Sequence, residues 1–103
     1  MITLDLPFPP ARSDPRRVDA AWREAAGFDI QLARPGKIAG AVRVDIRLEE
    51  RRADLNTCAN ALLDLLVIHG VIQNRAALHE LRLRRDRRIA GVRVSVRPIP
   101  DPE

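Results

Sequence analysis

Apolar and polar residues alternate along three short stretches of the chain, at residues 2–6, 42–49 and 92–97. A period of two predicts a β-strand with one buried and one wet face. The stretch at 42–49 is the clearest, because four aliphatic residues alternate there with four charged ones. We therefore expect these three strands, the last of them followed by a stiff, proline-rich tail over residues 98–103.

Apolar residues recur at helical spacing in a segment that follows the first strand. Ser13 or Asp14 is expected to cap this helix and Pro15 to occupy its first position. Gly27 is expected to end it, because glycine is common just beyond the end of a helix. Residues 28–33 are interpreted as an extended continuation.

A second helix is predicted from a cap at Asp54 to about His69, with Gly70 as its terminator. Its apolar residues form a surface wider than one stripe: Leu55, Ala59, Leu62, Leu63, Leu65, Leu66 and Val67. A helix with so broad an apolar surface packs on two sides. One side would face the sheet, and the other could face a partner subunit.

Residues 74–85 fit two patterns. Asn74 could cap a helix, whereas the alternation from Ala77 to Leu83 favours a strand. Residues 86–91 are typical of a turn, so the chain is expected to close like a hairpin. The resulting fold class is α+β: one domain over residues 1–103, with a mixed or antiparallel sheet and helices on one face.

The charge of the chain comes almost entirely from arginine. Lys37 is the one lysine among 18 basic residues, which face 14 acidic ones and leave a net charge of +4. Arginine matches phosphate geometry, which indicates nucleic acid, although a GC-rich genome also supplies arginine codons. A lone cysteine, Cys58, excludes an intrachain disulfide and, with no signal-peptide pattern or membrane-length apolar run, favours the cytoplasm.

The densest basic cluster is the run 82–88. It holds five arginines, and two more directly precede the second helix; the candidate DNA contacts are Arg51, Arg52, Arg75, Arg82, Arg84, Arg85, Arg87 and Arg88. A solvated face is the ordinary explanation of such a run. Because aromatic residues are scarce, any nucleic-acid binding is expected to follow backbone and shape, with weak sequence preference.

The segment that opens the second helix, Asp54-Leu55-Asn56-Thr57 followed by Asn60, and the loop at 70–75 together resemble the RusA family of Holliday-junction resolvases. The opening at residues 2–10 is also similar to the start of that family. The resemblance implies a β-α-β-α-β-β domain that forms a homodimer, binds branched DNA in recombination and repair, and nicks four-way junctions with a divalent metal. It also implies an origin in a phage or prophage region.

The chain departs from the family at the residues that hold the metal. Asp54 matches the first aspartate of the motif, but Asn56 replaces the second and Asn60 replaces the lysine. Asn74 and Arg75 replace the two loop aspartates. Magnesium prefers carboxylate oxygens, and a guanidinium repels it. We therefore expect a vestigial site without a cofactor, in which Arg75 contacts phosphate instead.

Two alternatives remain open at this point. The chain could be an active endonuclease with displaced ligands, in which Mg²⁺ is held by Asp54 together with Glu80 or with an acid from the second subunit. It could instead be a module that binds another protein through its apolar helix, with the arginines serving only solvation. Cys58, His69 and His79 are interpreted as structural residues in each case.

Overall fold

A computed structural model describes residues 1–9, 20–50 and 54–100 of the chain. Its strands are β1 (Ile2–Leu6), β2 (Val42–Glu49), β3 (Leu78–Asp86) and β4 (Val92–Pro98). They form one mixed sheet in the order β1-β4-β2-β3, in which β2 and β3 are parallel and the other neighbours are antiparallel. The α+β class and the three strands predicted from alternation are confirmed.

The expectation of a closing hairpin is wrong, because β2 lies between β3 and β4. Strand β4 buries three valines, whereas five of the nine residues of β3 are charged. The apolar strand therefore takes the interior of the sheet and the charged one takes the edge. The turn between them is tied to β2: Glu49 N donates to Gly91 O at 2.8 Å, and Gly91 N donates to Glu49 Oε1 at 2.9 Å.

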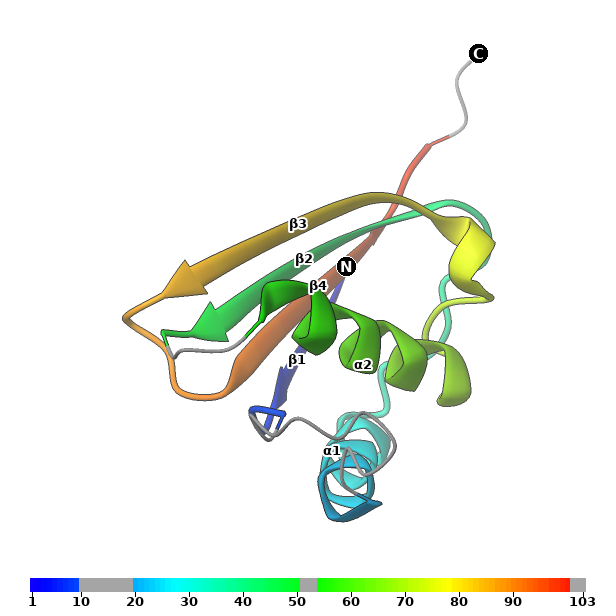
Figure 1. Ribbon diagram of the computed structural model, residues 1–103. Coiled ribbons are helices and arrows are strands. Elements are labelled where there is room, and N and C mark those ends of the chain that lie inside the picture. The colour runs from blue at the N-terminus through cyan, green and yellow to red at the C-terminus, as the bar shows by residue number, and fades with distance from the viewer. Residues whose placement is uncertain (10–19, 51–53, 101–103) are drawn as a thin grey trace.

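Both helices, α1 (Ala20–Ala33) and α2 (Leu55–Ile68), cover the same face of the sheet (Figure 1). The expected end of α1 at Gly27 is wrong, because Gly27 lies buried in the middle of this helix. A Cβ at Gly27 would lie 2.8 Å from Nε2 of His69, so this glycine permits close contact with the end of α2. The expected start of α1 at Pro15 lies outside the described residues.

Helix α2 has the predicted bounds, with Asp54 as its N-cap and His69 as its C-cap. Leu63 and Leu65, which widen its apolar surface, are only 1% and 3% exposed within the single chain. The chain itself therefore covers both sides of this helix, and the sequence-based suggestion that one side faces a partner subunit is wrong.

Both patterns at residues 74–85 contribute to the structure. Asn74 caps a single 3-10 turn, η1 (Arg75–Ala77), and the chain then continues as β3. The proline-rich tail begins later than predicted, since β4 extends to Pro98. In the described part of the chain, no helix is both long and apolar enough to cross a membrane.

The core lies between the two helices and the inner face of the sheet. Its buried residues are aliphatic apart from Trp22 and Cys58, and no polar side chain of the described residues is buried among them. The indole Nε1 of Trp22 donates to the carbonyl oxygen of Pro7 at 2.8 Å, which ties α1 to the end of β1. Among the described residues no helix covers the outer face of the sheet (Figure 1). The side chains that β2 and β4 place on this face are charged or polar.

Candidate nucleic-acid interface

The start of α2 holds the one aspartate that matches the resolvase motif. The carboxylate of Asp54 accepts a hydrogen bond from Thr57 Oγ1 at 2.7 Å and from Asn56 N at 3.3 Å. The Thr57 hydroxyl, aided by backbone N–H groups and by the charge of Arg85, lowers the pKa of Asp54 below its usual range. Both carboxylate oxygens thus serve the helix cap, and the side chain of Asn56 is exposed.

The structure brings Asn60 and Arg75 together, as the motif predicts, but they form a closed contact. Arg75 Nη2 donates to Asn60 Oδ1 at 3.0 Å, and Nη1 donates to Asp64 Oδ1 at 2.8 Å. The guanidinium is therefore neutralised by a carboxylate one turn further along α2. Asn74 lies beside this contact in sequence, and its Oδ1 accepts from Ala77 N at 2.9 Å as the cap of η1.

Glu80 lies on the outer face of the sheet, paired with Arg43, whereas Asp54 caps a helix on the inner face. The two carboxylates expected to share a metal are therefore on opposite faces of the sheet. Across residues 1–9, 20–50 and 54–100, no three His, Cys, Asp or Glu side chains come close enough to hold a metal ion.

The arginines of the run 82–88 do not form one surface. Arg82 and Arg84 point to the outer face of β3, whereas Arg85 is opposite buried Leu48 and acts electrostatically on Asp54 and Cys58. Arg87 and Arg88 lie at the turn, where they pair with Glu50 at 2.6 Å and Asp86 at 3.2 Å. Arg51 and Arg52 lie outside the described residues.

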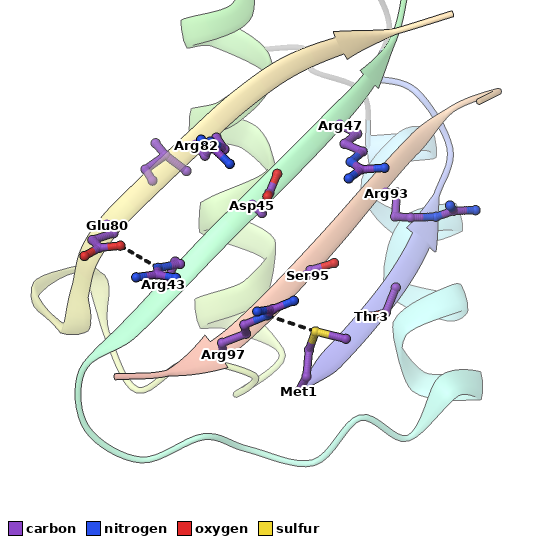
Figure 2. Close-up of a pocket in the computed structure, with 11 residues that line it drawn as sticks. Met1, Thr3, Arg43, Asp45, Arg47, Glu80, Arg82, Arg93, Ser95 and Arg97 are labelled. Carbon is purple, nitrogen blue, oxygen red and sulfur yellow. Dashed lines mark hydrogen bonds and ion pairs between the residues drawn. The ribbon is translucent and has the colours of Figure 1, made fainter. Parts of the chain in front are cut away.

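A basic surface lies on the outer face of the sheet, and sequence reasoning found only its members Arg82 and Arg84. It encloses a shallow hollow of about 840 Å³ (Figure 2). Its lining residues come from all four strands: Met1, Thr3, Arg43, Asp45, Arg47, Glu80, Leu81, Arg82, Arg93, Ser95 and Arg97. We call this surface, together with the neighbouring Arg84, the arginine face. The signal was present in the sequence, because the polar positions of 42–49 and 92–97 are mostly arginine.

Arginines lie opposite arginines across the strands of this face. Arg43 is opposite Arg97, and Arg47 lies between Arg93 on β4 and Arg84 on β3. Like charges directly opposite one another destabilise a sheet. The fold therefore holds three unfavourable pairs side by side on one surface, an arrangement that a bound anion would relieve.

Carboxylates of the chain offset part of this charge. Arg84 pairs with Asp45 at 3.4 Å and Arg93 with Asp5 at 2.9 Å, while the hydrogen bond from Arg93 to the Asp5 carboxylate raises the pKa of Arg93 further. Arg47 pairs with Asp86 at 3.8 Å. The carboxylates of Asp45 and Asp86 are only 29% and 10% exposed, whereas both members of the Arg93–Asp5 pair are exposed, and exposed pairs contribute only about 0–1 kcal/mol. A phosphate can therefore replace Asp5 beside Arg93 at small cost.

Two positions in the hollow lack an ionic partner among the described residues. Arg82 and Arg97 make no ion pair with any of these residues, and Nε of Arg97 donates to the sulfur of Met1 at 3.1 Å. Between them lies Asp45, whose Oδ1 is covered by protein yet has no hydrogen-bond partner. The hollow thus combines two guanidinium groups that no described carboxylate neutralises with an unsatisfied acceptor at its centre.

Comparison with known proteins adds no identification. No family model matches the chain, and no curated protein matches it. Any function is therefore argued from the residues and their geometry.

Proposed function

We propose that this chain binds the phosphate backbone of duplex or branched DNA through the arginine face and does not cleave it. The observation that carries the proposal is the set of opposed arginines: Arg43 with Arg97, and Arg47 with Arg84 and Arg93. Solvation alone does not require like charges to be opposed, because mixed signs on the same strands would keep the surface wet at lower cost. A polyanion across the strands turns this repulsion into attraction and releases counterions.

The chemistry of the face favours the backbone over the bases. None of the three aromatic residues of the chain lies on it: Trp22 is in the core, Phe8 packs against the core, and Phe28 is on α1. Without aromatic platforms, single-stranded bases have nothing on which to stack. The flat row of guanidinium groups instead suits the regularly spaced phosphates of a duplex.

The absence of cleavage is proposed from the contacts at the vestigial motif. Asp54 is used as a helix cap, and Arg75 occupies the loop where the resolvase family has aspartates. A phosphodiesterase needs clustered carboxylates to hold a metal against phosphate. The proposal keeps the resemblance to RusA resolvases as a relationship of sequence and assigns the chain a binding role in DNA recombination or repair, in the cytoplasm.

The test is a binding assay on a labelled four-way junction and on a linear duplex of equal length, with Mg²⁺, with Mn²⁺ and with EDTA. We expect salt-sensitive retention and no nicks under all three conditions. In the variant Arg47→Gln/Arg97→Gln, the slope of log affinity against log salt should flatten by about 0.9 for each phosphate that the variant no longer neutralises. The matched control Arg23→Gln/Arg75→Gln removes the same charge elsewhere and should bind like the wild type.

Two results would contradict the proposal. Metal-dependent symmetric nicks in the junction would show an active endonuclease with displaced ligands. No binding at low salt would leave the arginines as solvation and favour a protein-binding module.

A further inference from the structure

The hollow of the arginine face has a basic pair at each end. Arg43 and Arg97 are opposed at one end, and Arg47 and Arg93 are opposed at the other. A strand advances by about 3.3 Å per residue, so the two pairs are separated by about 13 Å along β2. A nucleic-acid strand that runs along β2 can therefore place a phosphate at each pair.

The floor between the two basic pairs consists of shorter polar side chains (Figure 2). Asp45 is opposite Ser95, and Ser95 is opposite Thr3 on β1. Asp45 has acceptor capacity to spare: Oδ1 has no hydrogen-bond partner among the described residues, and Oδ2 accepts a long bond from Arg84, at 3.4 Å. The side chain is 29% exposed and the torsion that turns its carboxylate is soft, so either oxygen can face the hollow.

The backbone of DNA has no hydrogen-bond donor for this carboxylate. Its phosphate and sugar oxygens all accept, and deoxyribose carries no hydroxyl within a strand. A DNA strand over the floor would therefore exclude water from Asp45 without replacing the lost hydrogen bonds, which costs free energy. Ribose adds a 2′-hydroxyl, which is both donor and acceptor. In an A-form helix these hydroxyls line a wide, shallow minor groove that a flat sheet can approach.

We propose that the arginine face binds a duplex with an RNA strand more tightly than a DNA duplex, and that Asp45 recognises the ribose. Two phosphates of the RNA strand lie at the two arginine pairs, and a 2′-hydroxyl between them donates to Asp45 and accepts from Ser95. The ligand is a duplex because the face has no aromatic side chain on which single-stranded bases could stack. This inference rests on the proposed binding of phosphate by the arginine face and names the sugar that fits beside it.

The first test varies the sugar and keeps the protein fixed. Fluorescence anisotropy at equal salt compares three duplexes of one sequence: the DNA duplex, the RNA–DNA hybrid, and a hybrid whose RNA strand carries 2′-fluoro groups in place of the hydroxyls. The 2′-fluoro strand keeps the A-form geometry and the phosphates but has no donor. The wild type should bind the RNA–DNA hybrid about tenfold more tightly than either other duplex, as one hydrogen bond to a charged acceptor provides.

The second test removes the carboxylate. Asp45→Ala should bind the DNA duplex more tightly than the wild type does, because a charge that repels phosphate is lost, and it should no longer prefer the hybrid. The matched control is Asp5→Ala, which removes a carboxylate of the same face that pairs with Arg93 at 2.9 Å. Asp5→Ala should tighten binding to all three duplexes and keep the preference for ribose.

Three results would overturn the recognition of ribose by Asp45 and leave the proposed binding to DNA in place. One is equal affinity of the wild type for all three duplexes. Another is a preference for the hybrid that Asp45→Ala retains. The third is a 2′-fluoro hybrid that binds as tightly as the RNA–DNA hybrid, which would assign the preference to A-form shape.

Failure of the proposed function gives different results. Retention of the RNA–DNA hybrid with no retention of the DNA duplex at low salt would support the recognition of ribose and contradict the proposed binding to DNA. No retention of any of the three duplexes would overturn both.

Discussion

At the scale of single residues, the turn before β4 depends on the absence of a side chain at Gly91. Its φ is +73°, and a Cβ there would lie 2.6 Å from the carbonyl oxygen of Leu6 in β1. Two separate costs therefore oppose any larger residue: the left-handed backbone and a contact with rigid backbone of the neighbouring strand. Gly40 has a φ of +82° with nothing within 4 Å, so it isolates the first cost.

We expect Gly40→Ala to lower the free energy of unfolding by about 1–2 kcal/mol, which is the cost of the left-handed conformation. Gly91→Ala should lower it by roughly twice as much, because the new methyl group also displaces the Leu6 carbonyl. Urea denaturation of both variants measures the difference. Equal losses would show that β1 moves away freely and that the contact with Leu6 carries no energy.

Asp54 supplies a prediction about pH. Its folded-state pKa is lowered, chiefly by the Thr57 hydroxyl, so the ionised form stabilises the folded chain. That stability is complete above the unfolded pKa of about 3.9 and is lost as the pH falls through the lower folded value. Asp54→Asn keeps a cap oxygen but removes the titration.

Comparison of urea midpoints at pH 7 and at pH 3 tests this assignment. The wild type should lose more stability between the two pH values than Asp54→Asn does, since other carboxylates titrate equally in both proteins. The matched control is Asp29→Asn, which replaces an exposed carboxylate on α1. An acid-induced loss that is the same in wild type and Asp54→Asn would contradict the role of the ionised cap.

At the scale of elements, alternation and capping residues predicted most helices and strands. Contacts between residues that are distant in sequence determined the remaining helix end and the strand order. The bounds of α2 follow from Asp54 and Gly70, which act within one turn of the helix ends. Gly27 predicted the wrong end for α1. A glycine is required there because His69, more than forty positions along the chain, packs against its Cα. Local sequence cannot report such a contact.

The candidate site was predictable only in part for the same reason. The meeting of Asn60 and Arg75 followed from the motif, but the choice of Asp64 as the acid beside Arg75 depends on how η1 packs on α2. The arginine face depends on strand order, since Arg43 and Arg97 are opposed only because β4 lies beside β2. A closing hairpin would have separated these arginines.

The opposed arginines of β2 and β4 should lower the free energy of unfolding, because they repel each other, and strengthen the proposed binding to DNA, because they attract phosphate. Arg97 is opposite Arg43 and has no carboxylate partner among the described residues. Arg97→Gln should therefore raise the free energy of unfolding by about 0.2–1 kcal/mol at low salt, while it weakens binding to duplex DNA.

The control for this effect is ionic strength, because salt screens the repulsion between exposed charges. The stability gain of Arg97→Gln should shrink in urea titrations as sodium chloride rises from low salt to about 1 M, where the Debye length is only about 3 Å. A gain that does not change with salt would assign the effect to side-chain propensity and not to the arginine pair.

At the scale of the whole molecule, the two faces of the sheet differ in chemistry, and under the proposed function this difference determines which nucleic acid binds. The helix-bearing face holds the core and all three aromatic residues lie off the arginine face, so the binding surface offers charge without stacking. A duplex presents phosphates at higher density than a single strand does and releases more counterions for each contact.

We therefore expect tighter binding to a duplex than to either of its single strands, and little change when the duplex sequence is scrambled. Fluorescence anisotropy with one labelled strand, alone and annealed, measures both comparisons at equal salt. Stacking contributes about 1–3 kcal/mol per base where aromatic platforms exist. A single strand that binds more tightly than the duplex would thus point to base contacts that the arginine face cannot make, and would move the binding surface to another part of the molecule.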